Sequence, residues 1–142
     1  MLVDFAVTEY VAMADTGSQH TILSPKVADD LGMDSDRSKP VELAFAGREQ
    51  DAYPASVSLS LLPPAGLDVE PVAWEADVVV ASHWVAWFDV LLGQRGLFNL
   101  FTATFSGHAA AFAIEGADAF DQRFEVPPVD LGEGPHAPRL TP

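Results

Sequence analysis

Near the start of the chain, residues 14–18 read Ala-Asp-Thr-Gly-Ser and follow a short apolar run at residues 10–13. This segment constrains the fold because it predicts that an extended strand ends at Asp15 and reverses sharply at Gly17. Asp and Ser side chains bond nearby backbone groups in turns, and Gly adopts positive φ angles without steric cost. The segment is therefore either an ordinary turn or a catalytic loop that holds the Asp15 carboxylate in a fixed frame.

The segments on both sides of this turn predict short strands and one helix. Residues 2–7 and 10–14 are extended segments separated by Thr8-Glu9, which is the loop length of a tight hairpin. Residues 21–23 are β-branched and apolar and predict a returning strand. Ser24-Pro25 then predicts an N-cap with Pro at the first helical position, and a helix over residues 26–31 that Gly32 ends.

The middle of the chain predicts a long hairpin and a buried strand. Residues 41–45 and 57–61 alternate apolar and polar side chains with the period of two that half-exposed strands show. Residues 46–51 between them are polar and predict a mobile, solvent-facing tip. Residues 72–81 predict a further strand, and three consecutive valines at residues 78–80 indicate burial on both faces.

Further elements follow an aromatic cluster that is typical of core or rim packing, formed by Trp84, Trp87 and Phe88. Residues 89–93 predict an apolar strand that stops at a glycine, and residues 95–100 predict a short helix. Residues 101–105 and 109–114 predict a second hairpin.

The last part of the chain differs in composition from the rest. Five prolines within residues 127–142, and no apolar periodicity, predict a flexible tail over residues 125–142. Residues 1–124 then form one domain. Its fold class is all-β with one or two short helices, arranged as a closed or nearly closed barrel.

Composition excludes several functions. The chain has no cysteine, and its four histidines lack metal-ligand spacing, so we expect no metal site and no cofactor. A formal charge of −14 argues against nucleic acid as a partner. This charge fits a cationic substrate, an acidic or salty environment, or simple solubility. The chain shows neither an apolar run of the roughly 18 residues that a membrane helix needs nor a signal-peptide pattern, so we expect no membrane association and a cytoplasmic location.

Two segments resemble the signatures of one enzyme family. Residues 15–24, Asp-Thr-Gly-Ser-Gln-His-Thr-Ile-Leu-Ser, resemble the active-site segment of retropepsin-like aspartic proteases. Residues 91–98, Leu-Leu-Gly-Gln-Arg-Gly-Leu-Phe, resemble that family's second signature, in which two apolar residues and a glycine precede a helix. The resemblance covers residues 1–115 and implies a small retropepsin-like β-barrel subunit. It also implies a homodimer that acts on peptide or protein substrates, with one catalytic Asp from each subunit.

The chemistry of such enzymes agrees with a dimer on physical grounds. Aspartic-protease chemistry needs two carboxylates that share one proton, because like charges about 3 Å apart cannot both ionise cheaply. The chain has a single Asp-Thr-Gly sequence and is too short to hold two such lobes. A second carboxylate must therefore come from another copy, and two-fold symmetry places the two loops face to face.

The resemblance assigns roles to five residues. It implies that Asp15 is the catalytic carboxylate and that Thr16 forms a hydrogen bond across the dimer axis. The Gly17 amide would bond the carboxylate, and Ser18 would bond its outer oxygen. Gly93 would pack beneath the loop.

The resemblance also implies a substrate-covering flap at residues 46–51, in which we single out Ala46, Gly47, Arg48 and Glu49 as substrate-binding residues. Closing such a flap excludes water from the reaction. We interpret His20, five residues after Asp15, as structural. We interpret Asp89 as a turn or strand-edge residue and not as a second catalytic acid.

Three hypotheses follow from the sequence. The first is a homodimeric aspartic endopeptidase. The second is a non-catalytic retropepsin-like module for dimerisation or peptide binding. The third is an unrelated acidic β-barrel in which residues 15–18 form only a turn.

Overall fold

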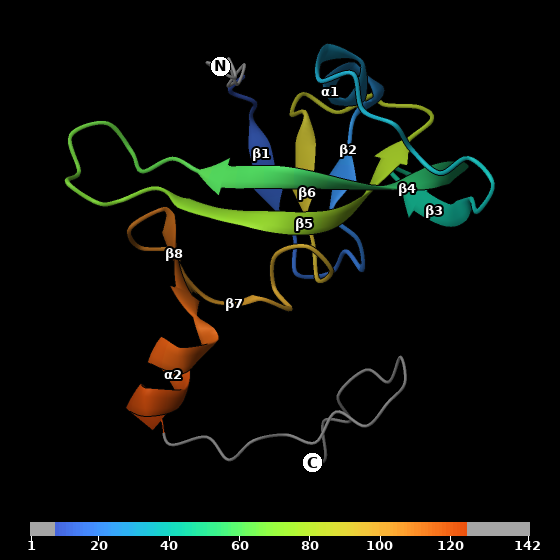
Figure 1. The fold of residues 1–142 in the computed structure, drawn as a ribbon. Helices are drawn as coiled ribbons and strands as arrows, with labels where there is room; N and C mark the ends of the chain where they lie inside the picture. Colours follow the sequence, from blue (N-terminus) through green and yellow to red (C-terminus); the bar gives the residue numbers. More distant parts are fainter. Residues whose placement is uncertain (1–7, 125–142) are drawn as a thin grey trace, which may run out of the picture. The chain divides into compact units, whose positions relative to one another are not determined.

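A computed structural model describes residues 8–124 and divides after Leu100 into two compact units (Figure 1). The first unit holds a sheet and one short helix. Its elements are β1 (Ala12–Ala14), β2 (Ile22–Leu23), α1 (Pro25–Asp30), β3 (Val41–Phe45), β4 (Arg48–Leu61), β5 (Val72–Ala81) and β6 (Val90–Leu92). The elements of the second unit are β7 (Phe101–Ser106), β8 (Ala111–Gly116) and α2 (Ala117–Phe124).

The first unit is a single curled, half-barrel sheet with the strand order β1-β6-β2-β5-β4-β3 (Figure 1). β1 runs parallel to β6, β6 antiparallel to β2, and β2 parallel to β5. The predicted class of mostly strands with few short helices is confirmed. Over the described residues the sheet is open, with β1 and β3 at its two edges, and not a closed barrel. The predicted strand at residues 2–7 lies outside the described residues.

The core lies where the central strands meet the aromatic cluster. β6 is buried along its whole length, and the valines of residues 78–80 in β5 are each at most 6% exposed, as their run predicted. Phe88 packs into this core. The rings of Phe45 and Trp84 stack on each other with centroids 4.6 Å apart, and both meet the Phe88 ring edge to face. Burial of each aliphatic side chain of β5 and β6 stabilises the fold by about 1.5–3 kcal/mol.

Helix α1 begins and ends as its local sequence predicts. The buried Ser24 hydroxyl oxygen accepts a hydrogen bond from the Val27 amide, and Pro25 occupies the first turn. Leu31 is the C-cap, and Gly32 follows it with a φ of 59°. That left-handed conformation favours glycine because it has no Cβ. The helix thus turns the chain away from β2 towards β3.

The β3–β4 hairpin corrects one prediction. Pairing continues to Phe45 opposite Arg48, so the turn is only Ala46 and Gly47, with φ angles of 52° and 73°. Two residues with positive φ match the right-handed twist of the flanking strands. The polar residues 48–51 belong to β4, and the prediction of a six-residue loop at this tip is wrong. Strand residues that face solvent are polar too, and the sequence pattern did not distinguish the two cases.

The segment after β6 corrects a second prediction. Residues 97–100 form turns and not the helix predicted over residues 95–100. Gly96 has a φ of 99°, which a right-handed helix cannot contain, and Arg95 forms a parallel bridge with His20. The Gly96 amide donates to the Asn99 side-chain oxygen at 3.0 Å, which stabilises the turn.

The second unit is the β7–β8 hairpin followed by α2. The hairpin confirms the prediction of two strands, and Phe105 and Phe112 stack across it with centroids 5.7 Å apart. α2 was not predicted; Arg123 joins it to Glu115 of β8 by an ion pair of 2.7 Å. The predicted tail lies outside the described residues, and the domain boundary at residue 124 stays a prediction. Neither helix of the described residues has the length and hydropathy to cross a bilayer.

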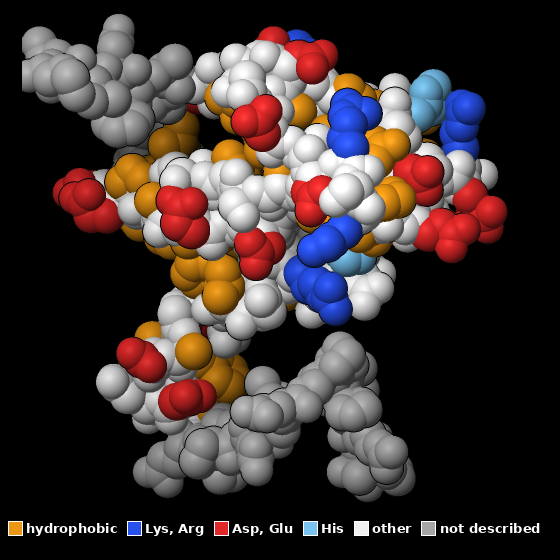
Figure 2. Space-filling view, turned by 45° about the vertical axis from the view of Figure 1, so that its right-hand side comes forward, with side chains coloured by type: hydrophobic (Ala, Val, Ile, Leu, Met, Phe, Trp, Pro, Cys, Tyr) orange, Lys and Arg blue, Asp and Glu red, His pale blue; other side chains and the backbone are white. Residues whose placement is uncertain are grey.

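The surface reflects the acidic composition of the chain. Figure 2 shows the acidic side chains at several separate places on one face, and not gathered in a single patch. The acidic side chains on this face therefore do not form one anionic patch.

Candidate active site

Asp15 lies at the end of β1, where the strand meets a tight turn. Its amide donates to the Leu92 carbonyl at 2.9 Å, which ties the turn to β6. The Ser18 amide donates to the Asp15 carbonyl at 3.1 Å and closes a four-residue turn. Asp15, Thr16 and Gly17 are exposed, so the side chain of Asp15 is accessible to a substrate or a second subunit.

The carboxylate of Asp15 is held by its own loop. The Gly17 amide donates to Asp15 Oδ1 at 2.9 Å, which is the bond that the family resemblance led us to expect. A Cβ at Gly17 would lie only 3.2 Å from this oxygen, so glycine allows the close approach. The Ser18 hydroxyl differs from expectation, because it donates to the His20 carbonyl at 2.8 Å and not to Asp15.

The second signature lies directly against this loop. The Gln94 amide donates to the Ser18 carbonyl at 2.8 Å, and the Arg95 amide to the Gln19 carbonyl at 3.0 Å. Gly93 is buried, and a Cβ there would lie 2.2 Å from the His20 carbonyl oxygen. The structure thus brings the two sequence signatures together and confirms that Gly93 packs against the loop.

Two residues of this arrangement were missed by the sequence reasoning. Thr21 is fully buried, and its hydroxyl oxygen accepts from the Gly93 amide at 3.1 Å. The Gln94 side-chain amide donates to the Thr16 carbonyl at 2.7 Å. The only signal for Gln94 was its position directly after Gly93. The contact of the Thr21 hydroxyl was not expected, because a threonine in a strand is accounted for by its β-branched side chain alone.

His20 is half-buried next to the loop. Burial, and secondarily the nearby Arg95 guanidinium, lower the pKa of the imidazole below its ordinary value. Both causes disfavour the charged ring. His20 is therefore neutral at neutral pH, and its carbonyl serves the loop by accepting from Ser18.

The predicted substrate-binding residues of the hairpin lie elsewhere in the sheet. Ala46 and Gly47 form the β3–β4 turn, and Arg48 and Glu49 are exposed residues at the start of β4. The strands β6, β2 and β5 lie between β1 and β4. Within one chain, Asp15 and this hairpin therefore stand at opposite edges of the sheet, and the flap role stays a prediction.

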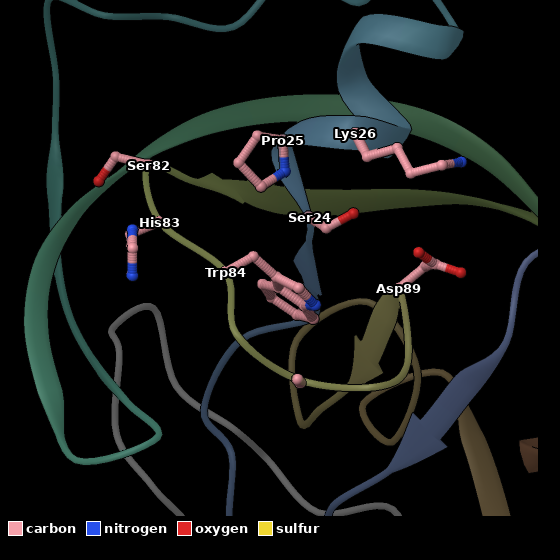
Figure 3. A pocket seen from close by; sticks show the side chains of 8 residues that line it. Ser24, Pro25, Lys26, Ser82, His83, Trp84 and Asp89 are labelled. Carbon is pink, nitrogen blue, oxygen red and sulfur yellow. The ribbon is translucent and has the colours of Figure 1, made fainter.

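Asp89 lies at the other end of β6 from the candidate site. Its amide donates to the Val11 carbonyl at 2.8 Å, so Asp89 lies beside Val11. Val11 precedes Asp15 by four residues, which is a distance of about 13 Å along an extended strand. Its side chain lines an open depression of about 490 Å³ together with Lys26, Ser24 and Trp84 (Figure 3). Asp89 is thus a strand-edge residue that cannot pair with Asp15 of the same chain.

The other two histidines of the described residues belong to no metal site. His83 is exposed beside the depression, and His108 is exposed in the β7–β8 turn. Over residues 8–124, no group of three or more His, Asp or Glu side chains is arranged to hold a metal ion.

Comparison with known families adds independent information. Residues 3–94 match the model of a family described as aspartyl protease, and this range includes the Asp15 loop and residues 91–94 of the second signature. No match was found among curated proteins or among solved structures.

Proposed function

Because this match spans more than half of the chain, the protein belongs to the aspartyl protease family, and we propose that it is an aspartic endopeptidase that works as a homodimer. The observation that carries the proposal is the exposed Asp15 carboxylate, whose Oδ1 is held by the Gly17 amide at 2.9 Å. No hydrogen bond of the described residues falls on its other oxygen. That oxygen is available to a water molecule and a second carboxylate.

The proposed reaction needs two copies of this loop. Two Asp15 carboxylates about 3 Å apart share one proton, so that one is ionised and one is neutral. The ionised carboxylate takes a proton from water as the water oxygen attacks the peptide carbonyl carbon. The neutral carboxyl gives its proton to the carbonyl oxygen. Collapse of the tetrahedral intermediate then breaks the C–N bond. The amine nitrogen leaves with the proton that the first carboxylate took from water, and the second carboxylate regains a proton from a hydroxyl of the diol, which restores the singly protonated dyad.

The β3–β4 hairpin supplies the substrate cover in this proposal. Its two-residue turn at Ala46 and Gly47 exposes backbone groups at the tip, and Arg48 and Glu49 present charged side chains beside it. A peptide bound across the dimer would lie under this tip, which would exclude water from the dyad. The charged side chains favour peptides with polar flanking residues.

One observation favours the alternative of a non-catalytic dimerisation or peptide-binding module. The Ser18 hydroxyl donates to His20, so Asp15 lacks one hydrogen bond that the family resemblance implies. In this alternative, the loop would still pair with a second copy but would not activate water.

Replacing Asp15 tests the proposal. Asp15→Asn keeps an oxygen that accepts from Gly17 but cannot act as acid or base, so we expect cleavage of a peptide library to fall by about 10²–10⁴-fold. The matched control, Asp34→Asn, changes an exposed loop carboxylate and should leave cleavage unchanged. Undiminished cleavage by Asp15→Asn would refute the proposal. A wild-type dimer that cleaves no peptide would support the non-catalytic module.

A further inference from the structure

The peptide group that joins Thr16 to Gly17 is held from both of its sides. Its carbonyl accepts a hydrogen bond from Gln94 Nε2 at 2.7 Å. Its N–H donates to Asp15 Oδ1 at 2.9 Å. Because a carbonyl only accepts, the Gln94 side chain must present its amide nitrogen here.

The planarity of the peptide group couples these two bonds. The carbonyl and the N–H of a trans peptide point in opposite directions in one rigid plane. Rotation that turns the Gly17 N–H away from Asp15 therefore also breaks the bond from the Thr16 carbonyl to Gln94. Holding the carbonyl fixes the direction of the N–H, and with it the carboxylate oxygen that accepts from it.

The backbone of Gln94 is itself well fixed. Its amide donates to the Ser18 carbonyl, and its carbonyl accepts from the Asn99 amide, both at 2.8 Å. The preceding Gly93 is buried against His20. Gln94 therefore contacts the turn at two points. Its backbone amide donates to Ser18, and its side-chain amide donates to Thr16.

We propose that Gln94 is a positioning residue, which orients the Asp15 carboxylate for reaction by clamping the Thr16–Gly17 peptide. This inference rests on the proposed function, since orientation matters only if Asp15 reacts. Gln94 acts through the peptide and does not itself contact the reacting atoms. A fixed carboxylate starts closer to the geometry of the transition state, and Gln94 therefore contributes to kcat more than to KM.

The first test observes the peptide without relying on activity. In the full chain, Gln94→Met removes the donor while keeping the length of the side chain. The matched control is Gln19→Met on the same loop, where the glutamine is exposed and makes no side-chain hydrogen bond among the described residues. We expect the amide proton of Gly17 to shift upfield in NMR spectra of Gln94→Met, and its hydrogen exchange to quicken about two- to tenfold. A Gly17 amide that behaves as in Gln19→Met overturns the inference.

A second variant makes the clamp depend on pH. The carboxyl introduced by Gln94→Glu can donate to Thr16 below an ordinary glutamate pKa of about 4.3, but it only accepts when ionised. We expect the Gly17 amide shift to match wild type at the acidic end and to depart from it as the pH rises through this value. A difference from wild type that is constant with pH overturns the inference, because a merely structural side chain would not titrate the peptide.

Kinetics then connects the clamp to the reaction. We expect Gln94→Met to lower kcat about two- to tenfold with KM unchanged, and Gln19→Met to change neither. An unchanged kcat overturns the inference. Failure of the proposed function is seen separately, because it would appear as undiminished cleavage by Asp15→Asn or as a wild-type dimer that cleaves no peptide, whatever the Gly17 amide shows.

Discussion

At the scale of single residues, the candidate site depends on backbone atoms that approach too closely for ordinary side chains. Gly93 lies against the carbonyl groups of Ser18 and His20, and its amide donates to the Thr21 hydroxyl oxygen. These contacts hold the second signature in place against the loop of Asp15. The position of the carboxylate therefore depends on residues that have no chemistry of their own.

Gly93→Ala tests this dependence. The new Cβ would lie 2.2 Å from the His20 carbonyl oxygen and 2.8 Å from the Ser18 carbonyl oxygen, and both are backbone atoms that cannot move alone. We expect a loss of unfolding free energy of about 3 kcal/mol, at the upper end for overpacking, measured by urea denaturation and tryptophan fluorescence. Gly17→Ala is the control, since its Cβ meets only the Asp15 carboxylate at 3.2 Å. Equal losses in the two variants would contradict the packing argument.

His20 predicts a pH dependence of stability. Its pKa is lowered in the folded chain by burial and by Arg95, so the unfolded chain binds the proton first as the pH falls below about 6.5. Stability should therefore be complete above that pH and decline as the pH falls through the lowered pKa. His20→Gln should make the decline below pH 6.5 shallower in chemical denaturation. An identical slope in wild type and His20→Gln would refute this cause.

At the scale of elements, local signals predicted those parts of the fold whose cause is local. Ser24-Pro25 predicted the start of α1, and strict alternation predicted β3. The valine run at residues 78–80 predicted the buried end of β5. Each of these depends on side chains within a few residues, which is what a sequence pattern records.

The predictions were wrong or incomplete where the local structure depends on an unusual backbone conformation or on a contact with residues distant in the sequence. Gly96 takes a φ of 99° that excludes the predicted helix, and the positive φ angles of the Ala46-Gly47 turn shorten the predicted loop. Gln94 went unnoticed because its role depends on Thr16, far away in the sequence. Of the candidate site, the loop, Gly93 and the bond from Gly17 to Asp15 could be predicted from the two signatures. The partner of the Ser18 hydroxyl and the contacts of Thr21 and Gln94 required the structure.

The β3–β4 turn offers a test at this scale. Ala46 has a φ of 52°, which costs an L-residue roughly 1–2 kcal/mol, whereas Asn before Gly is a preferred pair for such turns. We therefore expect Ala46→Asn to raise the unfolding free energy by about 0.5–1 kcal/mol, measured by thermal and urea unfolding. Ala65→Asn is the matched control, because it also precedes a glycine with positive φ but is not left-handed itself. Destabilisation by Ala46→Asn would argue against the two-residue turn.

At the scale of the whole molecule, charge opposes the association that the proposed reaction needs. Each copy carries a formal charge of −14, and Figure 2 shows acidic side chains dispersed over one face. The proposed dyad adds a local repulsion between two Asp15 carboxylates. The general repulsion is screened by salt over a Debye length of about 10 Å at 0.1 M, whereas a close pair that excludes water is screened much less. Salt should therefore strengthen dimerisation by screening the general repulsion, whereas protonation should also remove the repulsion between the two Asp15 carboxylates.

We expect the dimer to tighten as the pH falls from 7 to 5 at low salt, because protonation of histidines and carboxylates makes each copy less negative. Raising salt at pH 7 should also tighten it. Sedimentation equilibrium of the full chain would give both dissociation constants.

In Asp15→Asn the proton shared by the dyad is no longer needed, so the pH dependence of the dissociation constant should weaken while its salt dependence remains. A dimer that is tighter at pH 7 and low salt than at pH 5 would contradict the charge argument. An Asp15→Asn dimer with the full pH dependence of wild type would instead show that the two carboxylates do not meet.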